Sequence, residues 1–183
     1  LPKNNRSDGV WYAQPHPWMR SGPGTALDGK LKFDLNKFDQ SYFDRLRSRV
    51  IAARDRGVYV GIMLFDGWYL LGAPTSWQYH PFHGSNNVNG INGDANGNGQ
   101  GEETHTLQVP AIVDLQKAYV RKVIDTVNDL NNVLYEIANE SAVVGSTQWQ
   151  SELINIIKSY EAAKPKQHPV GMTSQAWSLG ATH

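Results

Sequence analysis

The sequence predicts a parallel α/β fold, because helical and strand patterns alternate three times along the chain. Three segments carry apolar residues at three- and four-residue steps, which predicts amphipathic helices: residues 38–56, 111–130 and 147–163. An apolar run follows each of them and predicts a strand: residues 58–65, 133–138 and 168–173. The length and β-branched content of residues 58–65 further predict a strand that is buried on both faces. A helix between successive strands is the connection that parallel strands require, so we expect βα units.

Three βα units predict part of a TIM (β/α)8 barrel, since a complete barrel needs eight units and typically about 200 residues or more. The chain has 183 residues, so we expect an apparently incomplete barrel forming a single domain over residues 1–183. Residues 1–37 lack periodicity and are predicted to be a loop at the barrel rim. Residues 66–110 form a long connection rich in Gly, Asn and His, and connections of this length are usually functional or disordered.

The composition excludes several classes of protein. Lys plus Arg and Asp plus Glu both number 17, so the formal net charge is zero and nothing favours a nucleic acid or a membrane surface as partner. Cysteine is absent, which excludes disulfides, thiolate metal sites and a cysteine nucleophile. No apolar run reaches the ~18 residues of a membrane span, and the first residues do not form a signal peptide.

Asn139 and Glu140 are the candidate catalytic residues, because they come directly after the predicted strand 133–138. The carboxyl ends of parallel strands meet at one edge of the sheet, where active sites of such folds lie. A glutamate beside apolar walls would have a raised pKa, as a general acid requires. The alternative is an ordinary helix-capping turn formed by Glu140 and Ser141, and the spacing alone leaves both interpretations open.

A family resemblance favours the catalytic interpretation. The run Val133-Leu134-Tyr135-Glu136-Ile137-Ala138-Asn139-Glu140-Ser141 resembles the fourth strand of the clan A glycoside hydrolases, which include the family 5 cellulases. Three further segments are similar to a subgroup of cellulase-like bacterial proteins: His16-Pro17-Trp18, residues 22–30 and His80-Pro81-Phe82-His83. The resemblance covers nearly the whole chain and implies strands three to five of the barrel.

The resemblance implies a retaining glycoside hydrolase acting on β-linked glycans. Glu140 would be the general acid/base and Asn139 would bind the 2-hydroxyl of the sugar. Such enzymes use a second carboxyl group about 5–5.5 Å away as nucleophile, and no residue here matches the family's nucleophile. Asp66, Glu102 and Glu103 are the carboxylates that could substitute for it, although acidic loop residues are more often solvated or capping groups.

Loop aromatic and polar side chains are predicted to bind the substrate. Sugar rings stack on aromatic faces, and hydroxyl groups need polar partners. The alternative for each ring is anchoring of a long loop, and a zinc cluster of the loop histidines fits no familiar spacing. The predicted substrate-binding residues are His16, Trp18, Asp66, Trp68, His83 and Trp177.

The loop after residue 93 resembles a calcium-binding loop. Asp94, Asn96 and Asn98 place oxygen ligands at positions 1, 3 and 5, with Gly99 at position 6. Position 12 is His105, where a bidentate glutamate is usual. The prediction is therefore a structural calcium ion, with a flexible turn-rich loop as the alternative and no cofactor required for the reaction.

The predicted function is hydrolysis of an oligo- or polysaccharide. The rival from another class is a non-catalytic carbohydrate-binding or vestigial fragment that lacks the nucleophile. Open sheet edges would also allow copies of the chain to associate. The resemblance to bacterial cellulases implies a secreted or extracellular protein.

Overall fold

The computed structural model describes residues 3–6, 9–72 and 76–172. Its largest sheet is parallel and has the order β5-β6-β7, formed by Val60–Asp66, Val133–Asn139 and Val170–Gly171. Three long helices alternate with these strands: α1 (Gln40–Arg54), α3 (Pro110–Val127) and α4 (Ser146–Glu161). The predicted alternation and the parallel pairing are confirmed.

The predicted TIM barrel is wrong. The described residues form a mixed α/β structure in which a three-stranded parallel sheet is accompanied by two small antiparallel sheets, and this is too small for eight βα units. Alternating helices and strands specify parallel neighbours, but they do not specify how many strands follow or whether the sheet closes. That outcome depends on strand tilt and register.

The predicted rim loop over residues 1–37 is also wrong, because this segment forms two antiparallel hairpins. The first pairs β1 (Lys3–Arg6) with β2 (Gly9–Tyr12), and the second pairs β3 (Trp18–Thr25) with β4 (Leu31–Phe38). Within β4, Phe33 and Leu35 are buried on one side, which is the alternation of a strand with one covered face. In β3 the alternation of apolar and polar residues is not evident from the sequence, because Gly and Pro residues interrupt it.

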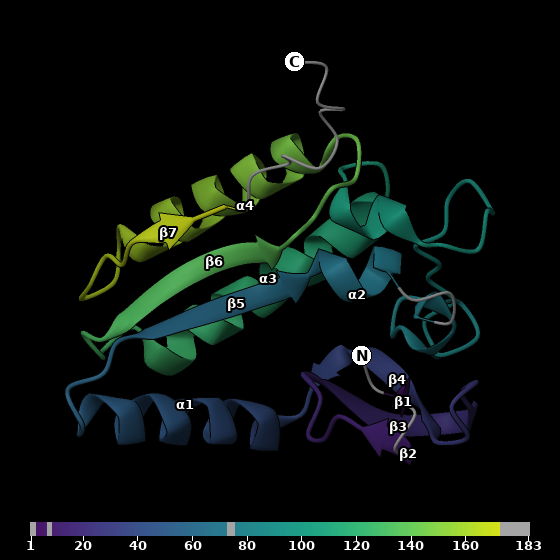
Figure 1. Ribbon diagram of the computed structural model, residues 1–183, viewed down its shortest axis with the longest axis horizontal. Helices are drawn as coiled ribbons and strands as arrows, with labels where there is room; N and C mark the ends of the chain where they lie inside the picture. The colour runs from purple at the N-terminus through teal and green to yellow at the C-terminus, as the bar shows by residue number, and fades with distance from the viewer. Residues whose placement is uncertain (1–2, 7–8, 73–75, 173–183) are drawn as a thin grey trace.

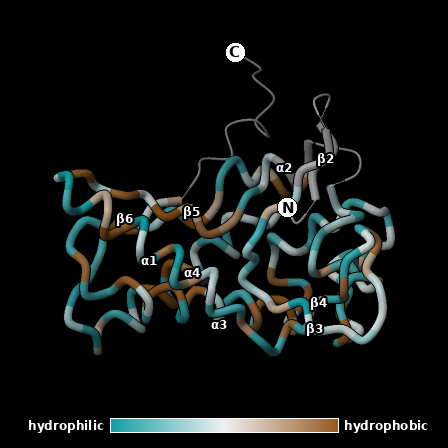
Figure 2. Tube along the Cα trace, turned by 90° about the horizontal axis from the view of Figure 1, so that it is seen from below, coloured by the Kyte–Doolittle hydropathy of each residue, from teal (hydrophilic) through white to brown (hydrophobic). Residues whose placement is uncertain are grey.

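Within the described residues the parallel sheet is covered on one face only, so the prediction that the strand over residues 58–65 is buried on both faces is wrong. Ile62 and Leu64 point to the core, whereas Met63 between them is 47% exposed. In the edge-on view of Figure 2, α3 and α4 lie on the same side of β5 and β6. The core forms between this covered face and the helices, where Val123 of α3 and Trp149 of α4 are fully buried.

The long connection over residues 66–110 is ordered by asparagine side chains. It contains α2 (Gly67–Gly72) and two 3-10 turns, η1 (Trp77–Tyr79) and η2 (Glu102–His105). The amide nitrogen of buried Asn87 donates to the carbonyls of Pro81, His83 and Ile91 at 2.8–3.1 Å. Side-chain amides thus satisfy backbone groups that would otherwise need a helix or a sheet.

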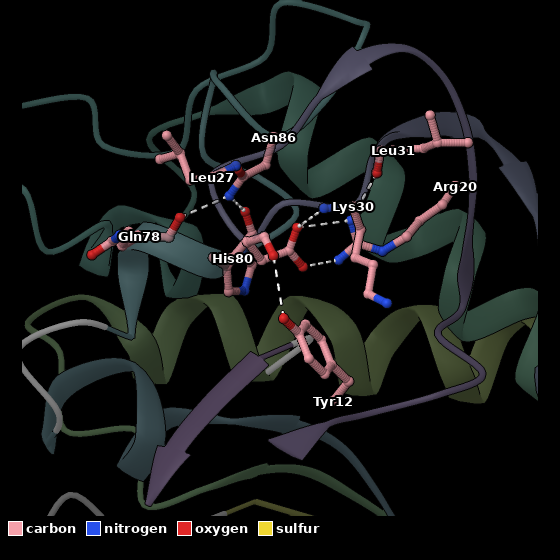
Figure 3. A network of polar contacts seen from close by, with 9 residues as sticks. Tyr12, Arg20, Leu27, Lys30, Leu31, Gln78, His80 and Asn86 are labelled. Carbon is pink, nitrogen blue, oxygen red and sulfur yellow. Dashed lines mark hydrogen bonds and ion pairs between the residues drawn. The ribbon is translucent and has the colours of Figure 1, made fainter. Parts of the chain in front are cut away.

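A second asparagine attaches this connection to the β3–β4 hairpin (Figure 3). The Asn86 amide donates to the carbonyls of Gln78 and His80, both at 2.9 Å, and its oxygen accepts from the amide of Leu27 at 2.8 Å. Next to Leu27 in the chain, the buried carboxylate of Asp28 forms an ion pair with Arg20. The hairpins and the long connection therefore gather near the carboxyl ends of β5 and β6, as Figure 1 shows.

No helix within the described ranges combines the length and the apolar character needed to cross a bilayer.

Candidate functional site

The carboxyl ends of β5 and β6 bring two of the predicted residues together. Asp66 and Asn139 are directly paired in the parallel register, so both side chains leave the sheet at the same level. The Asn139 amide donates a hydrogen bond to Asp66 Oδ1 at 3.3 Å. The amide thus orients the carboxylate and keeps a second N–H for a ligand.

Glu140 follows Asn139 in an unusual backbone conformation. Its φ of 45° is in the left-handed region, and within the described residues no other non-glycine position has a positive φ. Such a conformation costs on the order of 1–3 kcal/mol in a non-glycine residue and persists only where the surroundings enforce it. Gly67 permits the turn to pass this close, because a Cβ there would lie 2.5 Å from the Cα of Ser141 and 2.9 Å from the carbonyl oxygen of Glu140.

A series of buried side-chain contacts connects the turn after β6 to η2, α3 and α4. Ser141 Oγ is 2.9 Å from Nδ1 of His105, and the His105 ring stacks on Trp149 with centroids 4.4 Å apart. The Trp149 indole donates to Gln116 Oε1 at 2.8 Å, and Gln116 donates to the carbonyl of Thr104. Burial lowers the pKa of His105 to about 3, so the imidazole is neutral at physiological pH.

The helix-capping alternative for Glu140 and Ser141 is wrong. Helix α4 begins at Ser146 and its N-cap is Gly145, which has no side chain to cap with. Ser141 instead accepts a hydrogen bond at its carbonyl from Ser146 Oγ, at 2.7 Å. The turn is therefore tied to both α4 and η2.

A cavity of about 250 Å³ opens beside Asp66, and aromatic and imidazole rings form much of its wall. Its volume is just under the range of sites for drug-sized ligands, which suits a single ring. The rings that line it are His16, Trp18, Tyr42, Phe65, His80, Phe82, His105 and Tyr119.

The wall of this cavity is electrically neutral apart from Asp66. Desolvation lowers the pKa of His16 to about 3 and holds the pKa of His80 well below its ordinary value. The Tyr42 and Tyr119 hydroxyls are 3.0 Å apart, and burial raises the pKa of Tyr119. These groups offer hydrogen bonds without charge.

Two buried nitrogens in this region have no protein partner among the described residues. They are Nδ1 of His16 and Nε1 of Trp18, both on residues that line the cavity. Buried polar atoms are nearly always hydrogen-bonded, so an unpartnered donor in a cavity wall indicates a polar ligand or bound water.

The remaining predicted binding residues lie at different distances from this cavity. Trp68 follows Gly67 in α2 and is 59% exposed beside the candidate site. His83 does not line the cavity and packs against Trp77, with ring centroids 5.6 Å apart. Glu140 is not among the described residues that line it either, and Trp177 lies outside the described residues.

Sequence reasoning missed the side chains that complete the site. Tyr42 and Tyr119 belong to apolar helical stripes, which predicted only core packing. His105 was weighed as the twelfth position of a calcium loop, whereas it supports the turn after β6. Within the described ranges no three His, Asp or Glu side chains come together to hold a metal ion, so the zinc cluster has no support.

In α/β proteins the carboxyl edge of a parallel sheet is the usual place for a ligand site, and here a polar pair and a ring-lined cavity lie at that edge. The chain is a member of the family described as Domain of unknown function (DUF6298), whose family model matches residues 4–176. Neither the curated proteins nor the solved structures contain a match to it.

Proposed function

We propose that this protein hydrolyses β-linked glycans, with Glu140 as the general acid/base. The observation that carries the proposal is the grouping of Asp66, Asn139 and Glu140 at the carboxyl edge of the sheet, next to a neutral cavity lined by rings. A carboxylate, an amide and aromatic faces are the groups that a carbohydrate site combines.

The cavity has the chemistry that a sugar ring requires. A pyranose has apolar C–H faces, which pack on Trp18 and Tyr119, and hydroxyls at its edge, which need donors and acceptors. Asp66 is a charged acceptor, and His16 Nδ1 and Trp18 Nε1 lack protein partners. A neutral imidazole wall favours an uncharged ligand over a phosphate or a carboxylate, because it provides no counter-charge.

Glu140 would protonate the glycosidic oxygen as the bond to the leaving sugar breaks, and would then take a proton from the attacking water. Asn139 would hold the adjacent hydroxyl with the amide hydrogen that Asp66 does not use. Retention requires a second carboxyl group about 5–5.5 Å from the first. Asp66 is the carboxylate that lines the cavity in the described part of the chain, so it is the first residue to test as that partner.

The proposal predicts that Glu140→Gln abolishes hydrolysis of unactivated cello-oligosaccharides and leaves their binding intact. Loss of general acid catalysis costs about 10²–10⁴-fold in kcat, whereas an aryl β-glucoside with a dinitrophenol leaving group needs no protonation and should react much faster than the oligosaccharide in this variant. Steady-state kinetics on both substrates and calorimetric titration measure these effects. Equal oligosaccharide kcat values in the wild-type protein and the variant would exclude Glu140 as the acid.

A second candidate function is carbohydrate binding without turnover. It is favoured by the cavity wall, where Asp66 is the single carboxylate among the described lining residues and Glu140 is not included. In that case the wild-type protein would bind oligosaccharides and hydrolyse none of them. Asp66→Asn would weaken binding under either function, so turnover by the wild-type protein is the measurement that separates them.

We further propose that the protein acts outside the cell, because a polymeric glycan cannot cross a membrane to reach it. Immunodetection in the medium and in the cell fractions of the native host tests this location.

A further inference from the structure

The loop before η2 contains two buried carboxylate oxygens that have no partner in the described residues. They are Oδ1 of Asp94 and Oε2 of Glu103. A buried charged oxygen without a hydrogen bond or a counter-ion is strongly unfavourable, so each of them indicates a ligand that the protein atoms do not supply. Neither oxygen belongs to the cavity at the carboxyl edge of the sheet.

Glu103 points into this loop. The residue is only 3% exposed, and its other oxygen, Oε1, accepts a hydrogen bond from the backbone amide of Asn96 at 3.2 Å. The sequence has no Lys or Arg between Arg56 and Lys117. The Glu103 carboxylate therefore has no neighbouring cation along this part of the chain, and none of the ion pairs between described residues includes it.

In the same loop, Asp94 has one carboxylate oxygen that is hydrogen-bonded and one that has no partner among the described residues. Its Oδ2 accepts from the amide of Gly99 at 2.9 Å, which fixes the carboxylate and leaves Oδ1 without a donor. None of the ion pairs between described residues includes Asp94.

We propose that residues 94–103 bind one Ca²⁺ ion through the carboxylates of Asp94 and Glu103. Carboxylate, amide and carbonyl oxygens are the ligands that Ca²⁺ prefers, and two carboxylates balance its charge. Asn96 and Asn98 contribute amide oxygens from the same loop. Their Oδ1 atoms already accept from backbone amides two residues later, at 2.8 and 2.9 Å, and each oxygen keeps a second lone pair.

Glu103 takes the place that the calcium-loop pattern gives to position 12. His105 occupies that position and is committed to Ser141 and Trp149 instead. Glu103, two residues earlier, lies in the same 3-10 turn η2, and Thr104 and His105 of that turn line the ring-lined cavity. Calcium bound to Glu103 would therefore stabilise η2 and one wall of the cavity, whatever the cavity binds.

The test is titration of the full chain with CaCl₂ after treatment with a chelator. We expect one binding site with a Kd between about 1 µM and 1 mM, a range that runs from calcium-sensor proteins to extracellular modules. Because the ion binds only the folded state, the melting temperature should rise by about 5–10 °C when Ca²⁺ is at 100 times Kd. MgCl₂ should bind at least tenfold more weakly, since a flexible oxygen site suits the larger ion.

Two variants and one control make the assignment specific. Asp94→Asn and Glu103→Gln keep the shape of each side chain and should each weaken Ca²⁺ binding at least tenfold. In chelator both variants should melt at or above the wild-type temperature, because each removes an uncompensated buried charge. Asp34→Asn is the control, since the Asp34 carboxylate also accepts a hydrogen bond from a backbone amide but lies in β4, outside the loop.

Absence of binding heat in the wild-type protein would overturn the site. So would wild-type affinity in both loop variants, and equal affinity for Mg²⁺ would overturn its assignment to calcium. All of these readouts are independent of catalysis, so the calcium site and the proposed function can fail separately.

Discussion

The absence of a side chain at Gly67 allows the turn that contains Glu140 to pass close to it, and the backbone of Glu140 in that turn is strained. The turn after β6 passes so close to Gly67 that any Cβ there would meet backbone atoms, and Glu140 in that turn has a φ of 45°. Strain in a non-glycine residue at the end of a strand is typical of functional sites, because packing must hold the residue there. At the residue scale, the position of Glu140 therefore depends on Gly67 as much as on its own sequence context.

Gly67→Ala should destabilise the protein by about 2–3 kcal/mol, because the new Cβ would have to displace the backbone of Ser141 rather than a flexible side chain. Gly61→Ala is the matched control in β5, where a Cβ meets no atom within 4 Å. Alanine is favoured over glycine in a strand, so the control should be neutral or more stable by about 0.5 kcal/mol. Urea denaturation of both variants measures the difference, and equal free energies of unfolding would contradict the close contact.

His105 makes stability depend on pH in a predictable direction. Its pKa is about 3 in the folded protein and about 6.5 in the unfolded chain, so between these values only the unfolded state takes up the proton. The stability from the neutral ring is complete above about pH 6.5 and is lost progressively as the pH falls towards 3. His105→Gln should lower the slope of unfolding free energy against pH by up to about 1.4 kcal/mol per unit in this window.

The comparison needs denaturation curves for the wild-type protein and the variant at several pH values from 4 to 7. Loss of the stack on Trp149 changes the free energy of unfolding equally at every pH. Only the proton uptake of His105 changes the slope of that free energy against pH. An unchanged slope would therefore show that His105 takes up its proton at the same pH in the folded and the unfolded state.

At the scale of elements, the β3–β4 hairpin and the long connection after β5 hold each other in place through polar side chains. The Asn86 side chain accepts one hydrogen bond from Leu27 of the hairpin and donates two to carbonyls of its own connection (Figure 3). Within the hairpin, Arg20 pairs with Asp28, and the Arg20 guanidinium lies 3.9 Å from the centroid of the Phe33 ring. This arrangement brings His16 and Trp18 from the hairpin side towards His80 of the connection. The cavity therefore depends on a buried polar junction rather than on the sheet alone.

Asp28→Asn should cost about 2–3 kcal/mol, because it leaves the largely buried guanidinium of Arg20 without its carboxylate. The control is Asp129→Asn, which breaks the exposed two-point pair with Arg47 and should cost less than about 1 kcal/mol. Thermal melting of the two variants gives the comparison. A similar small effect in both would mean that the buried pair within the hairpin stabilises the fold no more than the exposed pair does.

At the scale of the whole molecule, helices cover one face of the parallel sheet, and the described part of the chain leaves the other face accessible. Met63 and Leu134 on the accessible face are 47% and 37% exposed. Within the described residues β5 and β7 are the edges of the sheet, at which further strands can pair. Association of copies through these edges remains a prediction, which light scattering over a range of concentrations would measure.

Local sequence patterns determined which segments are helices and parallel strands, because periodicity in a short window reports which face of an element is buried. The stripes that contain Tyr119 and Trp149 are sufficient to place α3 and α4. The apolar runs before Asp66 and Asn139 are sufficient to place β5 and β6, whose carboxyl ends bring these two residues to the same edge. The number of strands and the openness of the sheet depend on register and on contacts far apart in the chain, and the predicted barrel was wrong for that reason.

Tertiary structure alone decided how the site is assembled. Tyr42 and Tyr119 are 77 residues apart, and His105 and Ser141 are 36 apart, yet each pair forms a hydrogen bond. No local pattern distinguishes such side chains from ordinary core or loop residues, because their roles come from neighbours that only the fold provides. The sequence by itself determined that Asn139 and Glu140 follow an apolar strand, and the folded chain decided what surrounds them.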